Sequence, residues 1–130
     1  MSDVLIVEDE LGVRQFLKHV LQRADIPFRV ATTGEQALKL AAANWPTVVL
    51  LDLTLPGRWD GWQVWEGLSI LAGERPLRVV VFAAALTEAD KVQAARRGAW
   101  GSLRKPVLPS TLIATLRQAL EIETVERGWI

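Results

Sequence analysis

Charged side chains stand at the ends of three predicted strands, and their types are those that handle metal ions and phosphate. Glu8, Asp9 and Glu10 follow the first of these strands. Asp52 ends the third, and Lys105 ends the fifth. Converging carboxylates repel one another unless a cation lies among them, and a hard divalent ion such as Mg²⁺ meets that need. With a lysine beside it, such a site suits a phosphoryl group, although Asp9 or Glu10 could instead serve only a helix dipole.

These side chains converge only if the strands that carry them are parallel neighbours. Solid apolar runs rich in β-branched residues are typical of strands buried on both faces of a parallel sheet. Adjacent strands lie about 4.8 Å apart, so the acids after the first and third strands meet if those strands pair. The predicted strands are Val4–Val7, Val48–Leu51 and Val79–Phe82, with weaker candidates at Phe28–Ala31 and Gly101–Arg104.

In the segments between the predicted strands, apolar residues recur with the period of an α-helix. The order strand, helix, repeated five times, predicts an α/β fold with a doubly wound, five-stranded parallel sheet and helices on both faces. Thr87 is expected to cap the fourth helix and Gly98 to end it. The first helix has an apolar face of Val13, Phe16, Leu17, Val20, Leu21 and Ala24, and the others are expected at 35–43, 61–71, 88–97 and from about Pro109.

Composition excludes several classes of function. The chain has 130 residues with 15 basic and 15 acidic side chains, so no net charge favours nucleic acid or an anionic membrane. It has no cysteine and one histidine, His19, which excludes thiolate and multi-histidine metal sites. No apolar run reaches the roughly 18 residues of a membrane span. We expect one cytoplasmic domain over residues 1–130, with a core at about 3–125 and a short tail at 126–130.

The motifs at the strand ends resemble a known family, the receiver domain of two-component response regulators. The resemblance covers about residues 3–125 and implies a flavodoxin-like (βα)5 fold with the strand order 2-1-3-4-5. The motifs that carry it, in chain order, are Val7–Glu10, Leu51–Gly57, Asp60–Gly61, Gly98–Ala99 and Leu103–Pro106.

The resemblance implies a role for each charged residue. Asp52 would be the phosphoacceptor, taking a phosphoryl group from a sensor histidine kinase or a phosphotransfer protein. Glu8 and Asp9 would hold Mg²⁺ together with Asp52 and the backbone carbonyl of Thr54. Lys105 would contact the phosphoryl oxygens, and its bond to the following proline is expected to be cis. The protein would not be an enzyme, but a phosphoacceptor that assists its own phosphorylation and dephosphorylation.

Two positions depart from the family's pattern, and both concern signalling. Receivers usually place Thr or Ser at the end of the fourth strand, where this chain has Ala83, whose methyl group cannot donate a hydrogen bond. They usually place Tyr or Phe three residues before the lysine, where this chain has Ser102. One extra residue also stands between Pro56 and Asp60–Gly61. We expect phosphorylation to be retained and its readout to be weak, altered or located elsewhere.

Three functions remain open at this point. The first is a stand-alone receiver that is phosphorylated on Asp52 and acts on an unidentified protein target, with a weak homodimer as one option. The second is a phosphorylation-independent pseudo-receiver, a constitutive interaction module, which Ala83 and Ser102 favour. The third is a Mg²⁺-dependent phosphohydrolase. It would need an acid two residues after the nucleophile, where this chain has Thr54.

Six tryptophans stand out in a chain that has no tyrosine. Trp62 and Trp65 are three residues apart and share one face of the predicted third helix. Packing of this helix is the favoured interpretation, and a partner-docking patch is the alternative. Trp100, just before the fifth strand, is a second candidate for an interface.

Overall fold

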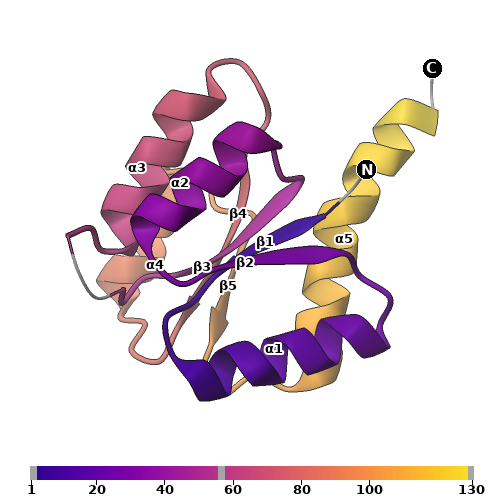
Figure 1. The fold of residues 1–130 in the computed structure, drawn as a ribbon, viewed down its shortest axis with the longest axis horizontal. Helices are drawn as coiled ribbons and strands as arrows, with labels where there is room; N and C mark the ends of the chain where they lie inside the picture. The colour runs from indigo at the N-terminus through magenta and orange to yellow at the C-terminus, as the bar shows by residue number, and fades with distance from the viewer. Residues whose placement is uncertain (1–2, 56–57, 129–130) are drawn as a thin grey trace.

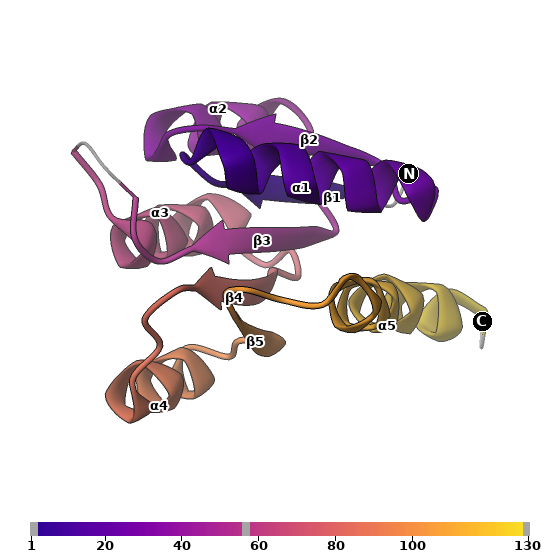
Figure 2. The ribbon, with the colours of Figure 1, turned by 90° about the horizontal axis from the view of Figure 1, so that it is seen from below.

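Five parallel strands form the centre of the molecule (Figure 1). The computed structural model describes residues 3–55 and 58–128. The strands pair in the order β2-β1-β3-β4-β5, as the resemblance implied, and this order can be followed from one end of Figure 2 to the other. They are β1 (Val4–Val7), β2 (Phe28–Ala31), β3 (Val48–Asp52), β4 (Arg78–Ala83) and β5 (Gly101–Arg104).

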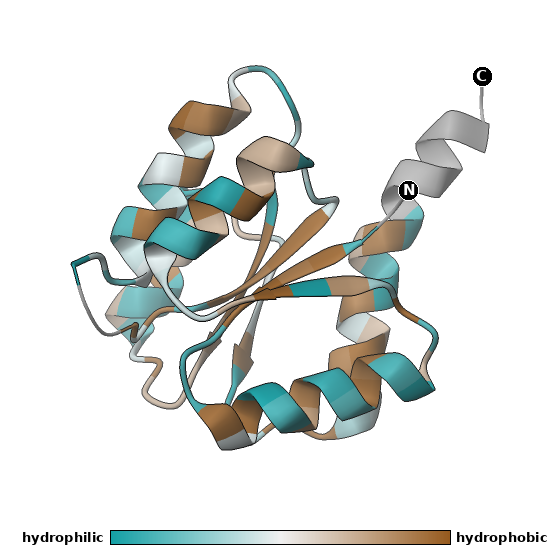
Figure 3. Cartoon of the chain, viewed as in Figure 1, coloured by the Kyte–Doolittle hydropathy of each residue, from teal (hydrophilic) through white to brown (hydrophobic). Residues whose placement is uncertain are grey.

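Five helices cover the two faces of the sheet and enclose two apolar cores, one on each face. One face packs against α1 (Leu11–Arg23) and α5 (Pro109–Gly128). The other packs against α2 (Gly34–Ala43), α3 (Gly61–Ala72) and α4 (Glu88–Arg96). Figure 3 shows hydrophobic residues concentrated in the strands at the centre. This double coverage explains why the three central strands, β1, β3 and β4, are mostly solid apolar runs rather than alternating ones.

Local signals in the sequence fix where several helices begin and end. The Thr33 side chain caps α2 by accepting a hydrogen bond from the backbone N–H of Gln36. Asp60 and Thr87 cap α3 and α4 in reciprocal capping boxes. Gly98 follows α4 with a φ of 84°, a conformation that favours glycine. The predicted cap at Thr87 and stop at Gly98 are therefore confirmed.

The register of the sheet brings the chemistry-bearing strand ends together. Val7, the last residue of β1, pairs with Leu51 of β3, so Glu8 and Asp52 extend from neighbouring ends. The expectation that the first and third strands are neighbours is thereby confirmed. On the other side of β3, Asp52 pairs with Phe82 of β4.

The last helix runs further than its apolar pattern suggested. α5 continues to Gly128, into the segment expected as a tail, while Trp129 lies outside the described residues. Pro56 and Gly57, beside the extra residue of the β3–α3 loop, also lie outside them. Within 3–55 and 58–128, no helix combines the length and the apolar character that crossing a membrane requires.

Candidate functional site

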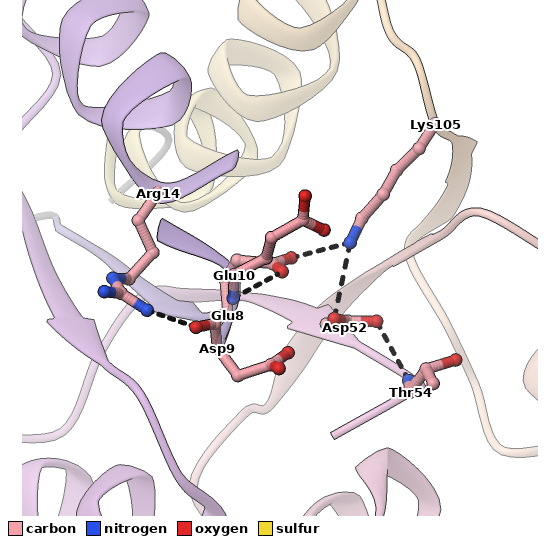
Figure 4. Close-up of polar contacts among 7 residues, drawn as sticks. All are labelled: Glu8, Asp9, Glu10, Arg14, Asp52, Thr54 and Lys105. Carbon is pink, nitrogen blue, oxygen red and sulfur yellow. Dashed lines mark hydrogen bonds and ion pairs between the residues drawn. The ribbon is translucent and has the colours of Figure 1, made fainter. Parts of the chain in front are cut away.

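Three carboxylates gather at the carboxyl ends of β1 and β3. Glu8 is 1% exposed and Asp52 is 3% exposed, whereas Asp9 is partly open to solvent. One oxygen from each of the three lies within 4.8 Å of the others. Figure 4 shows these side chains from the two strands facing a common space. The structure therefore brings together the three acids that the sequence analysis singled out.

Lys105 reaches this cluster from the end of β5. Its Nζ lies 2.8 Å from Oε2 of Glu8 and 3.3 Å from Oδ2 of Asp52 (Figure 4). The ring of Phe82 lies beneath the ammonium, with 5.0 Å between Nζ and the ring centroid. The bond from Lys105 to Pro106 is cis, as expected. One lysine thus forms ion pairs with two buried carboxylates.

Backbone and side-chain donors orient each acid. The backbone N–H of Thr54 donates to Oδ1 of Asp52 at 2.9 Å, and that of Glu10 donates to Oε1 of Glu8 at 3.3 Å. Arg14, on the first turn of α1, donates from its guanidinium to the backbone carbonyl of Asp9. The sequence analysis missed the roles of Arg14 and Phe82. An arginine one turn after an acidic run was the only signal, and it does not say where the guanidinium points.

Burial and crowding shift the titration of the site. Burial and the charge of Asp52 raise the pKa of Glu8 to about 6, although its hydrogen bond to Lys105 acts in the opposite direction. Burial also raises the pKa of Asp52, despite the Thr54 N–H and the Lys105 charge. Burial alone would lower the pKa of Lys105, but the two carboxylates raise it. The carboxylates together carry more negative charge than Lys105 neutralises, so further positive charge at the site would be favourable.

With this geometry established, comparison with known proteins decides the family. A sequence model of the response regulator receiver domain matches residues 4–117. The chain belongs to the receiver domain family. It is 37% identical over 123 residues to the KDP operon transcriptional regulatory protein KdpE of Escherichia coli, covering 92% of this chain and 52% of KdpE. It is 36% identical over 128 residues to the nitrate/nitrite response regulator protein NarL of Escherichia coli, covering 95% of this chain and 57% of NarL.

Solved receiver structures share the fold. The chemotaxis protein CheY4 of Vibrio cholerae superimposes with a TM-score of 0.80 at 28% identity, over 92% of this chain and 99% of that one. The fold class is therefore that of the CheY-like receivers. This receiver domain spans about half the length of the curated regulators that it matches.

The receiver's acidic cluster fits a small divalent cation. Ligand oxygens about 2.1 Å from one Mg²⁺ lie roughly 3 to 4 Å apart, and three carboxylate oxygens of this chain already lie within 4.8 Å of one another. All the donors are hard oxygens, and the buried acids carry more charge than Lys105 balances. Receiver domains generally bind Mg²⁺ at such a pocket, and the residues present here suit it.

The two atypical positions lie where the sequence analysis placed them. Ala83 is the last residue of β4 and is fully buried, and its carbonyl accepts a hydrogen bond from the Lys105 backbone N–H at 2.9 Å. Ser102 lies in β5 opposite Val81 and is exposed. The usual hydroxyl and the usual aromatic ring are thus both missing from this receiver at the positions where they would connect the site to the surface.

Proposed function

We propose that this receiver accepts a phosphoryl group on Asp52. The donor would be the phosphohistidine of a sensor histidine kinase or a phosphotransfer protein, the partners of receiver domains generally. The observation that supports this most is the buried carboxylate of Asp52, 3.3 Å from Lys105 and within 4.8 Å of the oxygens of Glu8 and Asp9.

In the proposed transfer, an Asp52 carboxylate oxygen attacks phosphorus and the phosphorus–nitrogen bond of the donor breaks. The imidazole nitrogen keeps the electron pair of that bond and takes up a proton from water. Lys105 would donate from Nζ to the phosphoryl oxygens as charge develops on them. Glu8, Asp9, Asp52 and the carbonyl of Thr54 would hold Mg²⁺, which supplies charge neutralisation and orientation when bound. The chain would act as a phosphoacceptor that assists both its own phosphorylation and its dephosphorylation, rather than as an enzyme.

Incubation with acetyl phosphate and Mg²⁺, followed by intact-mass measurement, tests this proposal. We expect the mass of one phosphoryl group to be added, and no addition for Asp52→Asn. Glu35→Gln, on the exposed surface of α2, is the matched control and should be modified like the parent chain. Equal modification of Asp52→Asn would overturn the assignment of the acceptor.

A phosphorylation-independent pseudo-receiver is the second candidate. Ala83 and Ser102 favour it, because neither can play the part of the usual hydroxyl or ring. The same experiment separates the two, since a pseudo-receiver would remain unmodified in acetyl phosphate and Mg²⁺. A phosphohydrolase is less well supported, because the residue two positions after Asp52 is Thr54 rather than an acid.

Other expectations stay predictions. The cytoplasmic location, the absence of nucleic-acid and membrane binding, the weak homodimer and the downstream protein target all await a direct test. So does the stand-alone role, because the curated relatives are about twice as long as this chain.

A further inference from the structure

The first turn of α3 packs directly on the backbone of the proposed acceptor. The N–H of Gly61 donates to the carbonyl of Leu53 at 3.0 Å. A β-carbon at position 61 would lie 2.4 Å from Cα of Leu53 and 2.5 Å from the carbonyl oxygen of Asp52, so only glycine allows this approach. A displacement of the Asp52–Leu53 backbone must therefore move the start of α3.

The residue after Gly61 fixes an aromatic ring on the same turn. The ring of Trp62 stacks on that of Trp65, with centroids 6.0 Å apart and planes 7° from parallel. Trp65 is buried in the core between α3 and the sheet, as the packing interpretation predicted, whereas Trp62 remains partly exposed. The ring of Trp62 consequently follows any movement of α3.

Arg97, at the C-terminal cap of α4, also contacts that ring. Its guanidinium carbon lies 5.3 Å from the centroid of the Trp62 ring, and its Nη1 lies 3.6 Å from Oε2 of Glu66 on α3. We name Trp62, Glu66 and Arg97 the α3–α4 clamp. The clamp joins two helices that are consecutive in the chain but separated by β4.

The body of α4 buries little of its surface against the described part of the chain. Its one buried residue among those described is Ala94, and Figure 2 shows the helix at the end of the molecule near β4 and β5. Gly98, with its φ of 84°, follows Arg97 and turns the chain towards β5. A helix with so small a buried surface is positioned largely by contacts at its ends, and the clamp is one of them.

We propose that the α3–α4 clamp carries the phosphorylation state of Asp52 to α4, in place of the hydroxyl and the ring that Ala83 and Ser102 lack. This rests on the proposed function, because the signal starts with phosphorylation of Asp52. Phosphorylation moves the Asp52–Leu53 backbone, Gly61 transmits the movement to α3, and the Trp62 ring shifts under Arg97. α4 then takes up a second position and presents a different surface to the protein target.

The strength of the clamp suits a switch. The side chains of Arg97 and Glu66 are 33% and 65% exposed, so their ion pair is weak and a small displacement of α3 is enough to break it. A tighter, fully buried contact would hold α4 in one place whatever the state of Asp52.

A single label on α4 tests the proposal, because the chain has no cysteine of its own. Val92→Cys, at an exposed position of α4, is coupled to a trifluoromethyl group and followed by fluorine NMR. Acetyl phosphate with Mg²⁺ should shift the label signal, and adding Asp52→Asn should abolish the shift. Arg97→Gln should change the ratio of the two α4 positions by about two- to fivefold, the effect of losing an exposed cation–π contact. Arg97→Lys, which keeps the charge, should retain part of the wild-type response.

Arg96→Gln is the matched control, since it removes the same charge from the preceding residue. No contact of Arg96 with Trp62 or Glu66 is found among the described residues. Its label shift should equal that of the parent. Intact mass is measured on every sample. An adduct on the parent with no label shift, or with equal shifts in Arg97→Gln and Arg96→Gln, overturns the clamp alone. The absence of any adduct overturns the proposed function and the clamp with it.

Discussion

Two ion-pair clusters at opposite ends of the same parallel sheet are built in contrasting ways. At the amino ends of the strands, Arg29 of β2 pairs with Asp3 at 2.7 Å. The same guanidinium donates to the carbonyls of Leu40 and Asn44 at 2.8 and 2.7 Å, at the C-terminus of α2. At the carboxyl ends, Lys105 is shared by two buried carboxylates.

The difference lies in charge balance and in geometry. Arg29 faces one carboxylate, and its planar fork is directed at fixed acceptors, two of which are carbonyls at the negative end of a helix dipole. Lys105 carries its charge at the end of a flexible chain and pairs with two acids, Glu8 and Asp52. A third acid, Asp9, lies beside them. The first cluster is balanced in charge and stabilises the fold, although Oδ1 of Asp3 is buried without a hydrogen-bond partner among the described residues. The second is short of positive charge and suits ligand binding.

Among the variants that separate the two clusters, Lys105→Met should have the largest effect, and it should act on phosphorylation. It removes the donor proposed to stabilise the phosphoryl oxygens, and loss of one such donor costs about 10²-fold or more in rate. The measurement is the rate of adduct formation with acetyl phosphate and Mg²⁺, read by intact mass. Lys91→Met, whose ion pair with Glu88 lies on the exposed surface of α4, is the control and should react at the parent rate. A rate for Lys105→Met equal to that of the parent would contradict the role of the lysine.

Arg29→Met should separate the two clusters by acting on stability alone. It removes the guanidinium from Asp3 and from the carbonyls of Leu40 and Asn44, of which the Leu40 carbonyl keeps the Asn44 N–H as a donor. The free energy of unfolding should therefore fall by about 2 to 3 kcal/mol in urea titrations. The phosphorylation rate of the folded fraction should be unchanged. Arg117→Met, which loses one exposed hydrogen bond to the carbonyl of Ala24, is the control and should cost less than about 1 kcal/mol. A slower phosphorylation of Arg29→Met would show that the amino-end cluster also serves the site.

The pH dependence of stability should expose the imbalance at the carboxyl ends. Burial raises the pKa of Glu8 from 4.5 to about 6, so the folded chain binds this proton more tightly than the unfolded chain does. Without Mg²⁺, the contribution of Glu8 to the free energy of unfolding should therefore rise by about 2 kcal/mol as the pH falls through 6 towards 4.5. Mg²⁺ competes with this proton, so its binding should weaken over the same interval.

Urea unfolding at several pH values, with and without Mg²⁺, measures both effects. Glu8→Gln should flatten the dependence between pH 6 and 4.5, because its side chain does not titrate. If the stabilities of the parent and Glu8→Gln change in parallel over that interval, the folded chain does not bind the Glu8 proton more tightly than the unfolded chain does.

Much of this site could be predicted from the sequence because strand ends are local signals. Glu8, Asp52 and Lys105 each follow a recognisable strand, and a parallel sheet brings such ends to one edge. The expected strands at Val4–Val7, Phe28–Ala31 and Gly101–Arg104 match the structure residue for residue. β3 and β4 extend beyond the predicted runs only to Asp52, Arg78 and Ala83 at their ends.

The contacts that could not be predicted are those made by long side chains across elements. Nothing in the sequence says that Arg14 turns back to the Asp9 carbonyl, or that Arg97 lies over Trp62 rather than in solvent. These depend on rotamers chosen by neighbours far away in the chain. Phe16 shows the same limit: periodicity placed it on the inner face of α1, yet it is 36% exposed beside an open pocket next to Lys105.

The hydrogen bond from Lys105 to Glu8 joins residues 97 positions apart. The first strand supplies one end of it and the last strand the other, so this bond cannot exist in a partly synthesised chain. When only the first four strands have been synthesised, the chain contains the carboxylates of the site but not yet the lysine. Completion of the site thus coincides with completion of the sheet.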